Sequence, residues 1–322
     1  MRVSRLIGAA LAAAAICTTA SAGVVNGGNS GNNGNGGNSD SELVPTGKGW
    51  GERPADFQGQ HGQANGAGNG QANKSNNGIS YHGGPIITGT VNAYYIWYGN
   101  WSGNSATTIL QDFGSNIGGS PYFNINTTYS NASGAKVSGA VHLAGSTTDN
   151  YSFGVALTDS QIESVVTQAI SSGRVPKDTN GVYFVLTSAD VNATSGFCTQ
   201  YCGWHDHATI GGSDIKYSFV GNPDRCPSAC EQQTTGPNGN AGADGMASII
   251  AHELEEATTD PDLNAWYDVR GQENADKCAW TFGTTYATTN GAKANMHLGT
   301  RDYLIQRNWV NASGGYCAVS YP

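Results

Sequence analysis

The sequence predicts an α/β or α+β fold built as a single disulfide-bonded domain. Three observations lead to this prediction. After residue 80, apolar runs typical of strands alternate with segments of helical spacing. Six cysteines fall within this region, and a helix with a histidine–glutamate motif follows the alternating part. Interleaved strands and helices usually form a sheet that is covered by helices.

Residues 1–22 have the features of a signal peptide. Two arginines precede an apolar run from Leu6 to Cys17, and the small residues at 20–22 suit cleavage after residue 22. This run is too short to cross a bilayer. We therefore expect a secreted, extracellular protein with no membrane span.

Charge excludes one class of partner. Cleavage removes two of the 15 basic residues and none of the 24 acidic ones, which leaves a formal charge of −11. Binding to nucleic acid or to an anionic membrane needs clustered Lys and Arg. The expected partners are therefore an extracellular protein or a cell-wall polysaccharide, and no nucleic acid.

Residues 23–80 form a leader rich in Gly and Asn, with few apolar residues. Such a composition cannot bury enough surface to offset its ordering entropy, so we expect the leader to be disordered. Residues 81–322 remain as the folded domain. Seven Asn-x-Ser/Thr sequons would mark surface in a eukaryotic host; they begin at Asn73, Asn100, Asn126, Asn131, Asn150, Asn192 and Asn311.

The elements of the domain follow in order. The segment 105–117 reads as a short helix, and the helix predicted at 158–173 opens with a cap residue and has apolar residues at helical spacing. Apolar or alternating patterns predict strands at 90–99, 135–145, 181–191, 215–222 and 301–310.

The cysteines of the mature chain predict three disulfides, because an even number in an exported protein is usually paired; 15 connectivities are compatible with six cysteines. The two Cys-x-x-x-Cys spacings leave thiolate zinc sites as the alternative. The six residues are Cys198, Cys202, Cys226, Cys230, Cys278 and Cys317.

The helix predicted at 244–260 contains "IIAHELEEATTDP", with Asp244 as its cap and Pro261 at its end. Residues four apart share a helix face, so His252 and Glu256 can reach one metal ion, with Glu253 beside the metal-bound water as general base. This is the zincin-like arrangement of a zinc-hydrolase helix, except that Glu256 stands where a second histidine is usual.

A third ligand must come from beyond this pair, and the candidates are Asp260, Asp262, Glu273 and Asp276. The alternative is a solvated acidic face without metal. The stretch from Cys226 to Val269 contains no Lys or Arg, which favours a cation near these acids. Zinc is the first expectation, and the carboxylate-rich ligand set leaves calcium or manganese open.

Three long segments, "FCTQYCGWHDHATIGGSDIKYSFVGNPDRCPSAC", "PNGNAGADGMASIIAHELEEATTDPDLNAWYD" and "ENADKCAW", together resemble the phosphate-induced protein family, which includes the plant EXORDIUM proteins. The resemblance covers about residues 83–320. It implies a secreted or cell-wall protein, linked in plants to growth and cell expansion, and it supplies no reaction.

Family resemblance also bears on the site. This chain resembles the family pattern at His252, Glu253, Glu256, Glu273, Asp276 and Cys278. Plant members often have Asn at the position of Asp260, so the third ligand is expected to be Glu273 or Asp276. His205 resembles the pattern too. A His-x-His pair with His207 on a strand could hold a metal or steady an oxyanion, whereas the alternative is a loop histidine held between disulfides.

These residues favour a metal-dependent peptidase or esterase with Glu253 and His205 as catalytic residues. One alternative is a non-catalytic extracellular protein with a structural metal site. Another is a glycan-binding module that stacks sugars on tryptophans, although such residues are usually core. The sequence contains no Gly-x-Ser-x-Gly motif. The tryptophans of residues 81–322 are Trp97, Trp101, Trp204, Trp266, Trp280 and Trp309.

Overall fold

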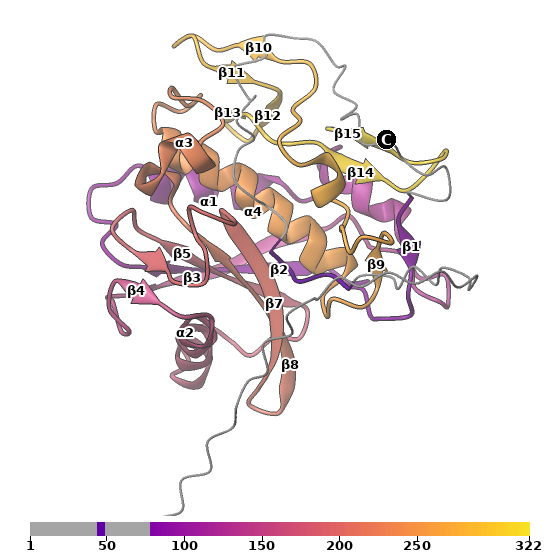
Figure 1. Cartoon of the computed structure of the whole chain (residues 1–322), viewed down its shortest axis with the longest axis horizontal. Helices are drawn as coiled ribbons and strands as arrows, with labels where there is room; N and C mark the ends of the chain where they lie inside the picture. Colours follow the sequence, from indigo (N-terminus) through magenta and orange to yellow (C-terminus); the bar gives the residue numbers. More distant parts are fainter. Residues whose placement is uncertain (1–43, 49–77) are drawn as a thin grey trace, which may run out of the picture. The chain divides into compact units, whose positions relative to one another are not determined.

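The computed structural model describes residues 44–48 and 78–322, which belong to one compact unit. At its centre is a five-stranded sheet in the order β3-β2-β5-β8-β7 (Figure 1). The mixed α/β fold expected from the sequence is confirmed. The strands are β2 (Val91–Tyr98), β3 (Val141–Asp149), β5 (Gly181–Thr187), β7 (Gly203–Ile210) and β8 (Ser213–Val220).

Four strands of this sheet are parallel, and β7 runs antiparallel to β8 at one edge. Parallel strands that are covered on both faces are apolar throughout, and every residue of β5 is buried. His205 lies within β7, opposite Ser218 of β8. The alternative of a loop at His205 is therefore wrong, because β8 pairs with β7 along its whole length.

Helices cover both faces of the sheet. The helices α1 (Ala106–Asn116) and α4 (Ala241–Thr259) pack together on one face, and α2 (Asp159–Ser171) packs on the other (Figure 1). In α4, every residue from Gly242 to Thr259 is buried. A helix buried all round belongs to the interior, so the alternative of a solvated acidic face is wrong.

The start of α4 differs from the prediction. Asn240 is its N-cap, and the Asn240 side chain accepts a hydrogen bond of 3.0 Å from the backbone N–H of Ala243. Asp244 instead lies in the first turn, where it accepts a 2.9 Å hydrogen bond from the backbone N–H of Asn238. The helix ends at Thr259, directly before Asp260 and Pro261.

Short paired strands lie outside the central sheet, most of them after α4. The single strand predicted at 301–310 is wrong, because residues 304–307 separate β13 from β14. The short pairs are β1 (Ser80–Tyr81) with β9 (Trp266–Tyr267), β10 (Tyr286–Ala287) with β11 (Lys293–Ala294), β12 (Met296–Leu298) with β13 (Arg301–Tyr303), β14 (Asn308–Val310) with β15 (Tyr316–Ala318), and β4 (Ala156–Leu157) with β6 (Asn192–Ala193). The remaining short helices are η1 (Phe123–Thr128), η2 (Pro223–Arg225), α3 (Pro227–Cys230) and η3 (Asp276–Cys278).

All six cysteines of the domain form disulfides, which rules out thiolate zinc sites. Two of these bonds, Cys198–Cys226 and Cys202–Cys230, tie the chain before β7 to the segment around α3. The third, Cys278–Cys317, ties η3 to β15.

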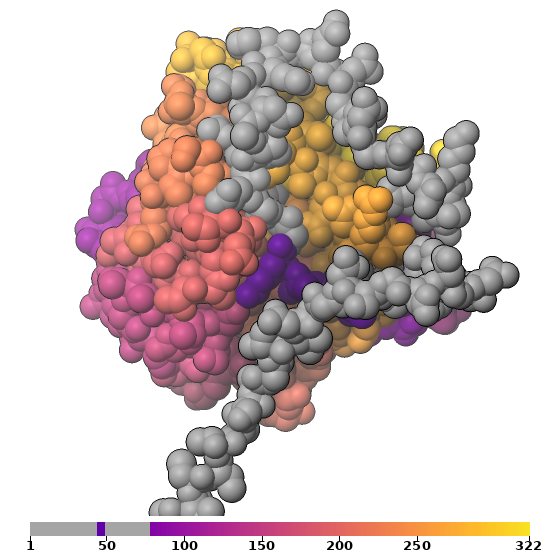
Figure 2. Space-filling model, viewed as in Figure 1, coloured from indigo at the N-terminus to yellow at the C-terminus, as the bar shows by residue number. Residues whose placement is uncertain are grey.

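Two short parts of the 23–80 segment lie on this fold. Ile79 is buried and Ser80 pairs with Tyr267. Residues 44–48, indigo in Figure 2, contact β7, where the backbone N–H of His205 donates a 3.0 Å hydrogen bond to the carbonyl of Gly47. The signal peptide predicted at 1–22 lies outside the described residues. Within the described part of the chain, no helix is long and apolar enough to cross a membrane.

Burial bears on two expectations about the surface, namely that sequons mark exposed positions and that tryptophans could stack on sugars. The sequon at Asn126 does not mark surface, because this side chain is fully buried and lies 3.2 Å from the amide of Asn274. Most of the tryptophans belong to the core, as is usual for them. Those exposed by 8% or less are Trp97, Trp101, Trp204 and Trp280.

Candidate metal centre

The motif helix α4 presents its polar side chains to the interior. His252, Glu253 and Glu256 are all fully buried. His252 Nε2 lies 3.0 Å from Glu256 Oε1, as expected for side chains one helical turn apart. The helix therefore supplies a histidine and two carboxylates on one side.

The loop that ends in η3 brings two further carboxylates to this helix. Asp276 Oδ1 lies 3.3 Å from His252 Nε2, and the backbone N–H of Asp276 donates a 3.1 Å hydrogen bond to Glu256 Oε1. Glu273, three residues earlier, is 1% exposed. Both downstream candidates for the third ligand thus lie at the motif helix.

Strand β7 contributes His205 from the opposite side of the cluster. His205 Nδ1 lies 3.4 Å from Glu253 Oε2 and 3.6 Å from Glu256 Oε2, and His205 Nε2 lies 3.6 Å from Glu273 Oε1. Gly203, two residues earlier on the same face, allows this close approach. A Cβ on Gly203 would lie 2.4 Å from Ile249 Cγ2 on α4, so any larger residue would push strand and helix apart.

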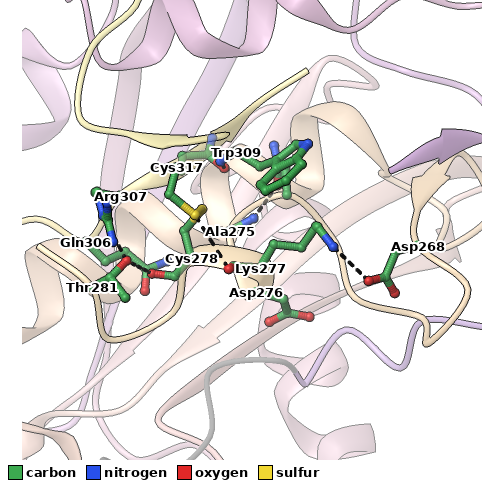
Figure 3. Close-up of a disulfide and its surroundings, with 12 residues drawn as sticks. Asp268, Ala275, Asp276, Lys277, Cys278, Thr281, Gln306, Arg307, Trp309 and Cys317 are labelled. Carbon is green, nitrogen blue, oxygen red and sulfur yellow. Dashed lines mark hydrogen bonds and ion pairs between the residues drawn. A yellow bond between two sulfur atoms is a disulfide. The ribbon is translucent and has the colours of Figure 1, made fainter. Parts of the chain in front are cut away.

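The disulfide Cys278–Cys317 anchors the loop that carries Glu273 and Asp276. Figure 3 shows this bond, with Lys277 extending to Asp268 and Trp309. Lys277 Nζ lies 2.9 Å from Asp268 Oδ2 and 4.9 Å from the centre of the Trp309 ring. The one lysine of this loop therefore pairs with a carboxylate outside the cluster.

Gln306 contacts His252, which the sequence did not predict. Its side-chain amide lies 2.5 Å from His252 Nδ1, and its backbone N–H donates a 3.1 Å hydrogen bond to Ser248 Oγ. Contact at Nδ1 fixes the ring so that Nε2 faces Glu256 and Asp276. Metal binding through Nε2 needs the ring proton on Nδ1, and Gln306 can accept that hydrogen bond through Oε1, which is buried without a hydrogen bond among the described residues, once its side-chain amide turns by 180°. Gln306 lies 54 residues from His252, and no spacing signal in the sequence links the two.

The separations within the cluster are those of ligands around an ion. With bonds of 2.0–2.2 Å, two ligand atoms on a tetrahedral zinc ion lie about 3.3–3.6 Å apart. The five separations between histidine and carboxylate atoms here run from 3.0 to 3.6 Å. A contact of 3.6 Å is too long for a hydrogen bond. Accordingly, both ring nitrogens of His205 and both oxygens of Glu253 are buried without a hydrogen bond among the described residues.

Burial and mixed charges shift the pKa values of the cluster in opposite directions. Burial raises the pKa of Glu253 to about 7, against the lowering effect of His205. For Glu256, burial would also raise the pKa, but His252 and His205 outweigh it and lower the value to about 2. Burial alone would lower the pKa of His205, but Glu273, followed by Glu253 and Glu256, raises it well above 6.5. Protons thus supply positive charge that a cation could supply instead.

Four carboxylates surround two histidines, and no lysine or arginine balances them. Among the residues that the structure describes, the ion pairs of these carboxylates are with His205 and His252 alone. Buried carboxylates without basic partners are costly unless they bind protons or metal. The four are Glu253, Glu256, Glu273 and Asp276.

Of the other candidates from the sequence, His207 and Asp262 lie elsewhere. His207 shares the β7 face with His205 but groups with Asp214 and Asp262, and its Nδ1 is 2.9 Å from Asp214 Oδ1. Asp262 is therefore not the third ligand. Asp260 Oδ1 accepts two 2.6 Å hydrogen bonds from backbone N–H groups in the turn after α4, so it holds that turn. Its Oδ2 is buried without a hydrogen bond among the described residues, and burial raises the pKa of Asp260 to about 6 against the lowering effect of His205. Asp260 therefore lies beside the cluster as well.

Glu255 is buried on the same helix but belongs to a different polar group. The side-chain amide of Asn308 donates to Glu255 Oε2, and burial raises the pKa of Glu255 well above its usual value. Glu255 therefore contacts Asn308, and it offers a matched control for Glu256 on the same helix.

Comparison with known proteins places the chain in a family. The family described as "Phosphate-induced protein 1 conserved region" matches residues 79–309, which include every member of the cluster. Protein EXORDIUM-like 3 of Arabidopsis thaliana is 33% identical over 279 residues, or 74% of this chain and 82% of that protein. Protein EXORDIUM-like 5 of Arabidopsis thaliana is 32% identical, covering 72% of this chain and 75% of that protein.

A tobacco relative is similar over a comparable span. Protein PHOSPHATE-INDUCED 1 of Nicotiana tabacum is 28% identical over 271 residues, or 70% of this chain and 83% of that protein. No solved structure matches the chain. The match over residues 79–309 and the identity to EXORDIUM-like 3 together establish that this chain belongs to the phosphate-induced protein 1 family.

Proposed function

We propose that this chain is an exported protein that binds a divalent cation beside α4 and hydrolyses a peptide or ester bond there. One observation supports the catalytic part. The Glu253 carboxylate is fully buried, has no hydrogen bond among the described residues, and lies in one group with His252 and Glu256 on α4. A carboxylate at this position can take a proton from a metal-bound water.

Each residue has a role in this proposal. His252, Glu256 and Asp276 hold the cation, and Gln306 orients His252 from behind. A bound divalent cation would supply an acidified water. Glu253 accepts the proton from that water, and His205 Nδ1, 3.4 Å away, is placed to stabilise the charge that Glu253 carries.

Zinc is the first choice of cation. The imidazole of His252 lies among the donors, and calcium takes oxygen ligands in proteins. Imidazole with carboxylate also suits manganese. The ligand set therefore favours zinc or manganese over calcium.

Elemental mass spectrometry on the mature chain, produced in an oxidising host, tests the cation. At least one bound metal ion per chain is expected in the wild type and in Glu255→Gln, and at least one ion fewer in His252→Ala and in Glu256→Ala. A screen of peptide and ester substrates then tests catalysis. Glu253→Gln should keep the metal and lose all turnover; turnover that persists in this variant would exclude Glu253 as the base.

A structural metal site is the second candidate, and one observation favours it. His205, His252, Glu253 and Glu256 are 0% exposed, so substrate reaches them only if the surrounding chain moves. A structural site predicts that removing the metal lowers the free energy of unfolding while no substrate is turned over. Glycan binding has less support, because most of the tryptophans are buried.

Export is supported by the sequence of residues 1–22 and by the three disulfides, which persist in oxidising compartments. We propose an extracellular or cell-wall location on these grounds. Mass-spectrometric detection of the mature N-terminus after residue 22 in culture medium would test it.

A further inference from the structure

Glu256 faces two histidines with its two oxygens. Its Oε1 lies 3.0 Å from His252 Nε2, while its Oε2 lies 3.6 Å from His205 Nδ1. The histidines come from different elements, α4 and β7, and approach the carboxylate from different sides. Glu256 therefore has the position of a bridging ligand.

The potential ligands separate into two groups around this carboxylate. One group is His252, Glu253 and Glu256, and the other is His205, Glu256 and Glu273. Within each group, one ligand atom from each residue lies within 4.8 Å of the others. Among the described residues, Glu256 is the member common to both groups.

One ion does not account for both histidines. Two ligand atoms on one zinc ion cannot lie farther apart than about 4.4 Å, which is twice the longest bond. Within the described part of the chain, no group of atoms within 4.8 Å of one another contains both His205 and His252. A single ion on His252 would leave His205 buried beside Glu253 and Glu273 with nothing to coordinate.

The charge of the site also favours two cations over one. Glu253, Glu256, Glu273 and Asp276 carry four negative charges when ionised, and neutral histidines add none. One divalent cation would leave two negative charges in a site whose side chains are at most 10% exposed. Two divalent cations would neutralise the site completely, and uncompensated buried charge is costly.

We propose that the site is dinuclear, with two divalent cations bridged by the carboxylate of Glu256. The first cation takes His252 and Glu256 of one group, to which Asp276 adds an oxygen 3.3 Å from His252 Nε2, and the second takes His205, Glu256 and Glu273. Glu253 lies beside both and is left as the base. This inference rests on the proposed metal site, but it assigns His205 to a second ion. Carboxylate-bridged pairs of ions about 3.5–4 Å apart are a known arrangement for hydrolysis.

Metal stoichiometry tests the inference separately from the site itself. The metal-free mature chain is titrated with Zn²⁺ and the bound metal is counted by elemental analysis. Two ions per chain are expected in the wild type and in Glu255→Gln, and one ion in His205→Ala and in His252→Ala. Glu256→Ala should bind both ions at least tenfold more weakly. Circular dichroism and disulfide mapping confirm that each variant is folded.

A second readout needs no variant. Two Mn²⁺ ions that share a carboxylate interact magnetically, so the wild type loaded with Mn²⁺ should give the electron paramagnetic resonance spectrum of a coupled pair. One ion per chain in the wild type, lost in His252→Ala and kept in His205→Ala, would overturn the dinuclear inference and keep the mononuclear site. Two ions with no coupling would overturn the bridge. No bound metal in the folded wild type would overturn both this inference and the proposed function.

Discussion

Removal of the disulfide Cys278–Cys317 tests how the ligand loop is held. The two cysteines are 39 residues apart in the sequence, and replacement of both by alanine frees the unfolded chain from that closed loop. The chain-entropy relation gives a loss of about 4 kcal/mol in the free energy of unfolding. Glu273 and Asp276 would also lose their attachment to β15, so we expect metal affinity to fall about 10–100-fold, as when residues behind metal ligands are lost.

A second disulfide provides the matched control. Cys198 and Cys226 are 28 residues apart, so their replacement by alanine should also cost about 4 kcal/mol by the same relation. This bond joins the chain before β7 to the residue that precedes α3. Its removal should therefore leave metal affinity within about twofold of wild type, or about 0.4 kcal/mol.

Urea unfolding of the metal-free proteins and competition with a chromophoric chelator supply the two measurements. Equal metal affinity in the two disulfide variants would refute the reasoning that Cys278–Cys317 positions Glu273 and Asp276. A stability loss below about 1 kcal/mol in both variants would refute the entropic estimate.

Three further predictions concern buried or closely packed groups. In Gly47→Ala, the new Cβ would lie 2.0 Å from the His205 carbonyl oxygen, at a backbone φ of +67° that side chains rarely adopt. The hydrogen bond from the His205 N–H to Gly47 should therefore weaken, and this N–H should exchange with solvent about tenfold faster or more. Thr46→Ala is the control, and unchanged exchange in Gly47→Ala would contradict the contact. Burial raises the pKa of Asp244 from 3.8 to about 6, so the folded state binds this proton more tightly than the unfolded state. Stability from Asp244 is therefore present below pH 4 and falls by about 3 kcal/mol as the pH rises through 6, whereas urea titrations of Asp244→Asn should lack this component. Burial raises the pKa of Glu255 well above its usual value and so favours its neutral form. The neutral amide of Glu255→Gln should therefore change the unfolding free energy by less than about 1 kcal/mol, and a loss above about 3 kcal/mol would show that the carboxylate form is needed.

Local patterns in the sequence were sufficient to predict some of the residues of this site. The spacing of His252 and Glu256 places both on one helix face wherever the helix lies in the fold, because it depends only on helical geometry. The resemblance to the family favoured Glu273 or Asp276 among the four candidates for the third ligand and pointed to His205. No periodicity connects these residues to α4. The same local reasoning failed at Asp244, where Asn240 takes the capping position four residues earlier.

By itself, the sequence determined the helix, its histidine and carboxylates, the even set of cysteines, and the family. Tertiary structure alone decided that Asp276 and Glu273 approach α4 while Asp262 groups with His207, that Gln306 contacts His252, and that Glu256 faces two histidines. These facts depend on how β7, α4 and the loop before η3 pack, over separations of 20 residues or more. Hydrophobic packing and the disulfides set those distances, and neither leaves a periodic pattern in the residues that meet.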